Sequence, residues 1–371
     1  MATDRAALPD KSHNLSEVLV ATTWECNLHC SYCFVHNKKL TVNQERMSPD
    51  LAVRVIDALD RGLAHIEKIC IHLYGGEPLI NIPAIEAMVR WASKKSKRFL
   101  FSVTTNGVIN DSAVYNLLDK GHFQIILSID GPKKVHDECR RTISGAPTHA
   151  HVLRFLKNIR TRTHCWVRGS AVVRPGWSLL EAVSYMNSLP LDAIKAQAVR
   201  VPPDSPYALS DREKTQYLYD LDELGKQVIA DLETSRIPKD DRFSSRVLQL
   251  LARKNRNSFC GAGQTSFGIA PDGSVLPCIL MDRHEARLGH VDDNPTVWLQ
   301  KGVDWRKQQR NSSECRHCNA YSLCGGGCHA VISVCGENEC EIIRKNCEVA
   351  TKIYQHFQSN PERLLALAGI V

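Results

Sequence analysis

The strongest constraint on the fold is an alternation between short apolar runs and helix-like segments from Glu17 to about Val201. Most of the runs are rich in Val, Ile or Phe, as buried strands are. Six units of a strand and a helix are two short of the eight in a closed barrel. We therefore expect an α/β fold, namely a partial (β/α)6 TIM-like barrel, and the later residues form a small cysteine-rich domain. The predicted strands are Val18–Thr22, Lys68–Tyr74, Phe99–Thr104, Gln124–Ser128, Trp166–Val173 and Ala193–Arg200.

Helical patterns separate these runs, which favours parallel strands joined by crossover helices. The first helix is expected over Asp50–Arg61, because Ser48 can cap it and Pro49 suits its first turn. The other helices of this region are predicted at Pro83–Ser96, Ser112–Asp119, Thr148–Arg160 and Ser178–Leu189.

The pattern changes after Val201, where a proline-rich linker begins. Ser210 and Glu213 form a capping box, which predicts a long helix to near Glu233, and a second helix is expected over Asp241–Lys254. Nine of the 15 cysteines lie between Cys260 and Cys347, with many glycines and little periodicity. The predicted divisions are an N-terminal tail (1–16), the barrel (17–201), a helical bridge (202–256), the cysteine-rich domain (257–350) and a C-terminal helix or tail (351–371).

The cysteine content indicates metal binding rather than disulfides. Residues 1–20 contain no apolar signal core, and no stretch approaches the roughly 18 apolar residues of a membrane span. A cytoplasmic location without a membrane partner is therefore expected, where thiols stay reduced. The formal charge is +7, but the basic runs Lys94–Arg98 and Arg253–Arg256 are short and lack interleaved aromatic residues. We interpret them as solvated helix ends and expect no nucleic-acid partner.

The first cysteine group follows directly on the first predicted strand. Cys26, Cys30 and Cys33 have the spacing C-x3-C-x2-C. Three thiolates on one loop can hold three irons of a cubane, which leaves the fourth iron open to a substrate. Zinc is the alternative and would need a fourth ligand such as His29 or His36, although this spacing is unusual for zinc.

This loop, with Tyr32 before its last cysteine, resembles the signature of radical S-adenosylmethionine (SAM) enzymes. Four further motifs that resemble the family follow in order: Gly75-Gly76-Glu77-Pro78, Thr105-Asn106-Gly107, Leu127–Gly131 and His136–Arg140. The resemblance implies that the glycines let the backbone approach the methionine moiety and that Arg140 pairs with the SAM carboxylate. The SAM contacts that it implies are Tyr32, Gly75, Gly76, Glu77, Pro78, Asn106, Ser128, Asp130 and Arg140.

The second cysteine group resembles the SPASM domain, an extension of some radical SAM enzymes that holds two auxiliary [4Fe–4S] clusters. Gly273 also matches that pattern. A pair of zinc ribbons is the alternative, since Cys315 and Cys318 have suitable spacing. The resemblance implies three [4Fe–4S] clusters in all. Its ligands for the first auxiliary cluster are Cys260, Cys278 and Cys328, and those for the second are Cys315, Cys318, Cys324 and Cys347.

Five cysteines remain outside these sets. Residues 261–266 contain no cysteine, so the first auxiliary cluster either has an open iron or takes Cys335 or Cys340 as its fourth ligand. We favour the open site and expect residues 335–340 to form a surface loop. Cys70 and Cys165 lie in or beside apolar strands and are expected in the core, as is Cys139, which also falls close to the predicted SAM site.

The resemblance implies reductive cleavage of SAM to a 5′-deoxyadenosyl radical that takes hydrogen from a substrate. Relatives with this C-terminal domain mostly modify peptides or proteins, through thioether, carbon–carbon or oxidative chemistry. A peptide or protein substrate and a flavodoxin- or ferredoxin-type reductant are therefore expected. About 17 residues precede the first strand, too few for a fused winged-helix domain. The substrate peptide is therefore expected to be bound by the barrel and SPASM surfaces or to be delivered by a separate protein.

Three alternatives remain: a sulfatase-type formylglycine maturase, an oxidase of small molecules in cofactor synthesis, and a non-catalytic iron–sulfur protein. In the sulfatase branch an Asp follows the second SPASM cysteine, whereas Ile279 follows Cys278 here. That difference argues against the branch, although Asp282 is another possible base. The sequence identifies no catalytic side chain.

Overall fold

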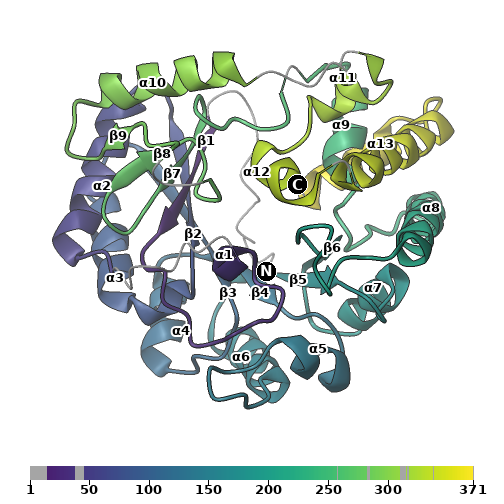
Figure 1. Cartoon of the computed structure of the whole chain (residues 1–371), viewed down its shortest axis with the longest axis horizontal. Helices are drawn as coiled ribbons and strands as arrows, with labels where there is room; N and C mark the ends of the chain where they lie inside the picture. Colours follow the sequence, from purple (N-terminus) through teal and green to yellow (C-terminus); the bar gives the residue numbers. More distant parts are fainter. Residues whose placement is uncertain are drawn as a thin grey trace. The chain divides into compact units, whose positions relative to one another are not determined.

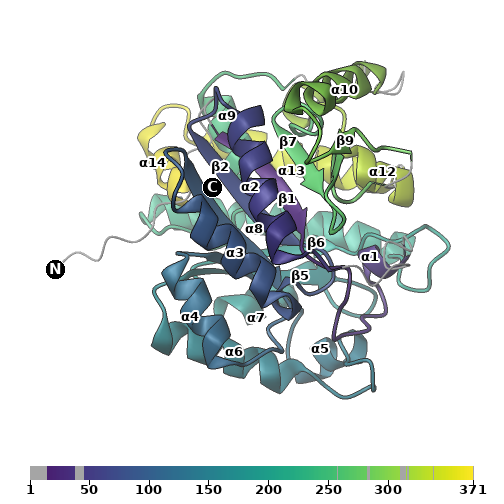
Figure 2. The ribbon, with the colours of Figure 1, turned by 90° about the vertical axis from the view of Figure 1, so that its left-hand side faces the viewer.

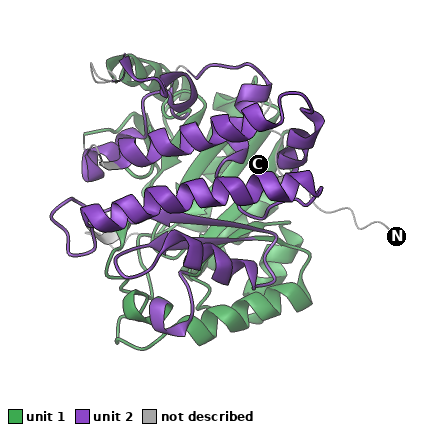
Figure 3. Cartoon of the chain, turned by 90° about the vertical axis from the view of Figure 1, so that its right-hand side faces the viewer, with its two compact units in different colours: residues 1–129, 136–167, 261–310 green, residues 130–135, 168–260, 311–371 purple. Residues whose placement is uncertain are grey.

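The computed structural model describes residues 15–37, 46–256, 258–281, 285–309, 315, 317–336 and 338–370. Most of the predicted N-terminal tail lies outside these ranges, as does Asp282. Contacts divide the chain into two compact units, shown in different colours in Figure 3. Unit 1 comprises residues 1–129, 136–167 and 261–310, and unit 2 comprises residues 130–135, 168–260 and 311–371.

The sheet of unit 1 contains the first four predicted strands (Figure 1). Its order is β4-β3-β2-β1-β7-β8-β9, and the pairs from β4 to β7 are parallel. The register of β1 with β2 joins Leu15 to Lys68 and Ala21 to Tyr74. The carboxyl ends of these strands therefore lie at one edge. The strand bounds are β1 Leu15–Ala21, β2 Lys68–Tyr74, β3 Arg98–Thr105 and β4 Gln124–Ser128.

Helices α2 and α3 pack side by side along this sheet (Figure 2). The α2 helix begins as the sequence predicts, because the Ser48 side chain accepts a hydrogen bond from the Leu51 backbone and proline occupies the first turn. The Trp91 indole of α3 donates to Asp57 of α2 at 2.8 Å. The helices of this part of the chain are α1 Phe34–Asn37, α2 Pro49–Gly62, α3 Ile82–Ala92, α4 Ser112–Lys120, α5 Lys133–Cys139 and α6 His149–Arg162.

The remaining two predicted strands are β5 (Trp166–Val173) and β6 (Ala193–Ala198), which pair in parallel from Arg168–Ala193 to Val173–Ala198. The strand–helix alternation of a partial TIM-like barrel is thus confirmed. Ser210 and Glu213 form the predicted capping box at the start of α8 (Asp211–Glu233). A second capping box starts α7 (Leu179–Asn187), whereas α9 (Ser244–Leu251) is shorter than predicted.

The cysteine-rich region contains more regular structure than its weak periodicity indicates. Strand β7 pairs in parallel with β1 and continues through two short antiparallel strands. In unit 2, Cys335 ends α12 and Cys340 lies in the first turn of α13, so the predicted surface loop at 335–340 is mostly helical. The elements are β7 Ser266–Ile269, β8 Ser274–Leu276, β9 Gly289–His290, α10 Pro295–Gln308, α11 Tyr321–Cys324, α12 His329–Cys335, α13 Asn338–His356, α14 Glu362–Leu365 and the 3₁₀ turns η1 Pro78–Ile80 and η3 Ala366–Ile370.

All 15 cysteines are free thiols, as a metal-binding chain requires. Cys70, Cys139 and Cys165 are buried, which confirms the prediction that they belong to the core. Arg253 and Lys254 are exposed, but Arg256 of the same basic run is half-buried, so this run is not simply a solvated helix end. In the part of the chain that the structure describes, no helix is both long and apolar enough to cross a bilayer.

Candidate cofactor and metal site

The first cysteine group occupies a tight loop at the carboxyl end of β1. Inside the loop, Cys33 donates its backbone N–H to the Cys30 carbonyl at 3.0 Å, and the Leu28 N–H lies 3.4 Å from the Cys26 sulfur. The loop is also paired with the segment after α5, because the N–H groups of His29 and Ser31 donate to the carbonyls of Arg141 and Cys139. The backbone therefore fixes where the three thiols lie before any metal binds.

The glycines after β2 are required by the approach of the segment that leads into this loop. A Cβ atom on Gly76 would lie 2.0 Å from the Glu25 carbonyl oxygen, and one on Gly75 would lie 2.6 Å from that of Thr23. Gly76 donates to the Thr23 carbonyl at 3.2 Å, and Glu77 donates to that of Glu25 at 2.8 Å. The resemblance implies that these glycines let the backbone approach the methionine moiety of SAM. The structure shows that they let two backbone segments come into close contact.

Glu77 joins the ends of β2 and β3. Its buried carboxylate accepts hydrogen bonds from the Leu79 N–H, the Thr105 hydroxyl and the Asn106 N–H at 3.2, 2.9 and 2.7 Å. Burial raises the pKa of Glu77 to about 7, although these three hydrogen bonds oppose the shift. Pro78 is the first residue of the η1 turn and is buried. Both Glu77 oxygens are thus occupied by the protein's own donors.

Asn106 connects this network to the cysteine loop. Its side-chain nitrogen donates to the Asn27 side chain at 2.7 Å and lies 3.8 Å from the Cys26 sulfur, and its oxygen accepts from the Val108 N–H. Asn27 was not predicted from the sequence, since a single amide between two cysteines carries no signal of its own. On another side of the loop, the Arg140 guanidinium lies 5.5 Å from the centre of the Tyr32 ring.

The two remaining predicted SAM contacts, Ser128 and Asp130, lie in different units. Ser128 ends β4 in unit 1, at the edge shared with the cysteine loop, and is buried. Asp130 belongs to unit 2, where its carboxylate accepts from the Val172 N–H at 3.1 Å and its carbonyl accepts from the Trp177 indole. The described contacts of Asp130 are therefore structural, and its role toward a cofactor stays a prediction.

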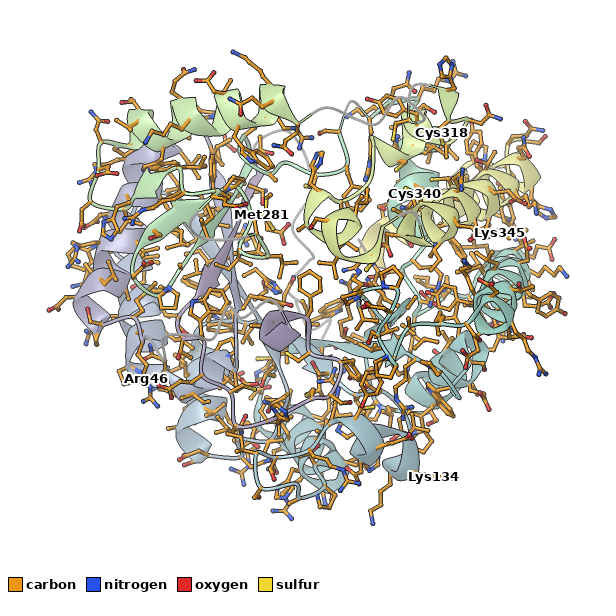
Figure 4. All side chains as sticks on the ribbon, in the orientation of Figure 1. Arg46, Lys134, Met281, Cys318, Cys340 and Lys345 are labelled. Carbon is orange, nitrogen blue, oxygen red and sulfur yellow. The ribbon has the colours of Figure 1, made fainter. Side chains whose placement is uncertain are left out.

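The electrostatics of the loop favour neutral thiols until metal binds. Burial is the main cause that raises the pKa of Cys26 to about 12. The Leu28 N–H opposes this shift, and the negative charges of Glu77, Cys30 and Cys33 support it. The coupling shows that the three thiols lie near one another. Metal binding would release their protons. Outside the loop, Arg46 (labelled in Figure 4) donates to Glu25 at 2.9 Å and ties down the segment before Cys26.

The second group has four predicted ligands in one unit. Cys315, Cys318, Cys324 and Cys347 all belong to unit 2, and Cys318 is labelled in Figure 4. Cys347 is electrostatically coupled to Cys318 and Cys324, which indicates that these thiols share one neighbourhood. Burial raises the pKa values of Cys324 and Cys347, and the Arg246 guanidinium opposes both shifts.

The glycines between Cys324 and Cys328 allow that neighbourhood to form. All three have positive φ angles, from 72° to 97°, which L side chains rarely adopt. A Cβ on Gly325 would lie 2.3 Å from the Ser258 backbone. The backbone N–H groups of Gly326 and Gly327 lower the pKa of the Cys324 thiol, against the burial that raises it. The turn thus places backbone N–H groups near the Cys324 thiol and leads to Cys328 at the start of α12.

The predicted ligands of the first auxiliary cluster are divided between the units. Cys278 lies in unit 1, and Cys260 and Cys328 lie in unit 2. The backbone after β8 crosses β7 so closely that a Cβ on Gly268 would be 2.3 Å from the Ile279 nitrogen. Ile279 has no exposed surface and packs in a core cluster with Ala21 and Trp24. Whether Cys335 or Cys340 completes this ligand set stays a prediction.

The donors present fit iron–sulfur clusters. Each predicted set contains thiols and no carboxylate, and soft thiolates are the ligands that such clusters use. Among the described residues, no three His, Cys, Asp or Glu side chains converge closely enough to hold a single metal ion. His29 is exposed, and the side chain of His36 lies outside the described residues.

Comparison with known families covers the first cysteine group and Cys260, Cys278, Cys315 and Cys318 of the second. Residues 21–189 match the model of the Radical SAM superfamily, and residues 260–319 match that of SPASM, an iron–sulfur cluster-binding domain. The chain is a radical SAM enzyme. Its cofactors are S-adenosylmethionine and [4Fe–4S] clusters, with two auxiliary clusters as is typical of SPASM enzymes. The SAM contacts and the division of cysteines between clusters remain predictions from resemblance.

Similarity extends along most of this radical SAM enzyme. A cysteine-type anaerobic sulfatase-maturating enzyme of Clostridium perfringens is 24% identical over 347 residues, which cover 85% of this chain and 88% of the relative. The radical SAM cyclopropyl synthase TigE of Paramaledivibacter caminithermalis is 23% identical over 41% of this chain and 34% of its own. The structure titled native anSMEcpe with bound AdoMet has a TM-score of 0.78 and 19% identity, covering 93% of this chain and 99% of that one.

Proposed function

We propose that this radical SAM enzyme modifies a peptide or protein side chain by abstracting one of its hydrogen atoms. Similarity to sulfatase-maturating enzymes through both the Radical SAM and SPASM regions carries this proposal. The modification belongs to the thioether, carbon–carbon or oxidative types found in ribosomal-peptide maturation. A flavodoxin- or ferredoxin-type protein supplies the electron, and a separate recognition protein presents the peptide if the enzyme does not bind it unaided.

The residues of unit 1 would hold the SAM-cleaving cluster on Cys26, Cys30 and Cys33. When bound and reduced, that cluster supplies the electron that splits SAM into methionine and a 5′-deoxyadenosyl radical. The protein's contribution is placement. Asn106 and Glu77 fix the loop against β2 and β3 through two hydrogen bonds of 2.7 Å each. The Asn106 side chain donates to Asn27 of the loop, and the Asn106 backbone N–H donates to Glu77. This leaves the loop little freedom to shift as charge changes on the metal.

A sulfatase-type formylglycine maturase is the second candidate, and the same similarity favours it. Ile279 counts against it. The position after Cys278 is filled by a fully buried apolar side chain in a core cluster, so it offers no base. A maturase of that type would need its base elsewhere in this chain.

Anaerobic reconstitution tests both candidates against a non-catalytic protein. About 12 iron atoms per chain are expected for three cubanes, and dithionite with SAM should give 5′-deoxyadenosine. The Cys30→Ala variant should give none and serves as the blank. Full zinc occupancy without SAM cleavage would exclude an enzyme of this class.

Substrate trials then separate the candidates. The chain should be incubated with the Kp18Cys peptide, which is bound in an anSMEcpe structure, and with short Cys- or Thr-bearing peptides encoded beside its gene. An aldehyde trapped by a hydrazine on the Kp18Cys peptide would establish the second candidate. A mass change confined to a neighbouring peptide supports the first. Turnover of only a small metabolite would replace both with a cofactor-synthesis oxidase.

A further inference from the structure

Two arginines from one short stretch of unit 2 accompany the thiols predicted to bind the second auxiliary cluster. Arg246 lies in α9, and Arg256 follows the end of that helix. The α9 helix packs against α13, which carries Cys347. Leu250 of α9 and Phe259 pack on the cluster of Leu323, Ile343 and Cys347. Apolar packing therefore holds the arginine-bearing stretch against the cysteine-bearing one.

Hydrogen bonds fix the same stretch to the turn that carries Cys318 and Cys324. The Arg256 N–H and the Gln249 side chain both donate to the Ser322 carbonyl at 2.8 Å. The Arg256 guanidinium donates to the Phe259 carbonyl at 3.4 Å. Both arginines are only partly exposed. Long cationic side chains held in this way lose rotamer freedom, which a purely solvating role would not require.

The charge of these arginines reaches the thiols. The Arg246 guanidinium interacts electrostatically with the thiols of Cys324 and Cys347, and the Arg256 guanidinium interacts with those of Cys324, Cys347 and Cys260. The Nε atom of Arg246 is buried with no hydrogen-bond partner among the described residues. A buried guanidinium donor without an acceptor is costly, and an anionic cluster beside it would supply one.

One carboxylate moderates this arrangement. Glu339 interacts electrostatically with Arg246, but it also forms an ion pair with Arg200, whose Nη2 lies 3.6 Å from a Glu339 oxygen. Arg200 is the cation coupled to Cys328, a predicted ligand of the other auxiliary cluster. Arg200 and Arg246 therefore both interact with Glu339, whereas Arg256 interacts with thiols.

We propose that Arg246 and Arg256 set the reduction potential of the second auxiliary cluster by neutralising its charge. This inference rests on the ligand set of the proposed function. A [4Fe–4S]²⁺ core with four thiolates carries about −2, and one added electron makes it about −3. Two fixed guanidinium charges favour the more negative state, so they raise the potential at which the cluster accepts an electron. No proton needs to move, because arginine stays charged.

The test is an electron paramagnetic resonance titration of the reconstituted full chain against solution potential. The Cys318→Ala variant identifies the signal, since it should lose that one spectrum and about four iron atoms. In Arg246→Gln, the same signal should show roughly a tenfold lower ratio of reduced to oxidised cluster at a fixed potential, equal to about 59 mV for one electron. Arg256→Gln should move it in the same direction by a smaller factor.

Two controls separate charge from structure. Lys254→Gln removes a positive charge from the same basic run at an exposed position and should leave the signal unmoved. Arg246→Lys keeps the charge and should keep most of the potential. If Arg246→Gln instead loses the cluster, retention of iron in Arg246→Lys supports the charge role, and loss in both variants overturns it. An unchanged potential in Arg246→Gln with full iron also overturns it.

Failure of the proposed function would look different. Wild-type protein that binds about 12 iron but never yields 5′-deoxyadenosine would refute the enzyme while leaving the potential shifts measurable. Unaltered iron content in Cys318→Ala would refute the ligand set itself.

Discussion

The two cysteine groups are built in opposite electrostatic surroundings. In the loop of residues 26–33, the ionisable neighbour coupled to Cys26 outside the loop is the acid Glu77. In unit 2, the Cys347 thiol interacts with two cations, Arg246 and Arg256, besides the neighbouring thiols. An acid beside a cluster opposes an added electron, and a cation favours it. The comparison indicates that the first site suits a strongly reducing cluster, and that the second suits one that is easily reduced.

Removing one ligand from each group should give the largest contrast. Cys30→Ala removes a ligand from the site that is open to SAM, so 5′-deoxyadenosine formation should fall below detection. Cys318→Ala should still cleave SAM while losing about four iron. Chromatography of 5′-deoxyadenosine beside iron analysis measures both. Equal loss of cleavage in the two variants would break the comparison.

Glycine substitutions should discriminate between the groups with a smaller effect. Gly76→Ala forces a Cβ against the Glu25 backbone and should cost about 3 kcal/mol of apo-protein stability and disrupt the first cluster. Gly325→Ala meets the Ser258 backbone and should disrupt the auxiliary clusters that Cys324 and Cys328 are predicted to hold, while leaving the cluster of the first cysteine group intact. Thermal unfolding and cluster spectra follow the two losses. Gly369→Ala is the matched control, since a Cβ there meets no atom within 4 Å.

Glu77 should make apo-protein stability depend on pH. Its pKa of about 7 lies above the usual value of 4.5 for a glutamate, so the folded protein holds this proton more tightly than the unfolded chain. Its contribution is full below about pH 4.5 and is lost as the pH rises through about 7, a difference of about 3 kcal/mol. Denaturant titrations at pH 5 and pH 8 should show a smaller difference in Glu77→Gln. An equal pH difference in both proteins would contradict the burial argument.

The ion pair of Glu25 and Arg46 should contribute least. Both side chains reach solvent, and exposed pairs stabilise proteins by less than about 1 kcal/mol. Arg46→Ala should therefore unfold near the wild-type temperature and retain SAM cleavage. A marked loss of cleavage would show that this pair positions the loop, and the first site would then depend on surface charge as well as on buried hydrogen bonds.

The sequence predicted the alternating strands well because buried parallel strands leave continuous apolar runs. Lys68–Tyr74, Gln124–Ser128 and Trp166–Val173 coincide with β2, β4 and β5. Strand β7 was missed because Ser266–Ile269 is only four residues long and its pairing partner is distant in sequence. Helix α13 was missed because two cysteines and a dense charge pattern obscure its apolar face.

The site was predictable where a motif carries a fixed chemistry, as the cysteine spacings do. It was not predictable where the function depends on which side chains meet. Asn27 and Arg246 belong to no motif, and only the folded chain brings them to Asn106 and Cys347. The glycines of residues 75–76 accommodate the backbone of residues 23–25, a contact that the sequence did not indicate, and their role toward SAM stays a prediction.

The pairing of β1 with β7 has a consequence for synthesis on the ribosome. Glu17 pairs with Ser266 and Val20 with Ile269, and Ser16 donates to the Thr265 carbonyl at 2.7 Å. The strand that leads into the first cysteine loop therefore keeps one edge without backbone hydrogen bonds until a segment about 250 residues later in the chain has been synthesised. Nascent chains that stall before that point expose an unpaired strand edge, which promotes aggregation. Loading of the first cluster is thus expected to follow translation rather than accompany it.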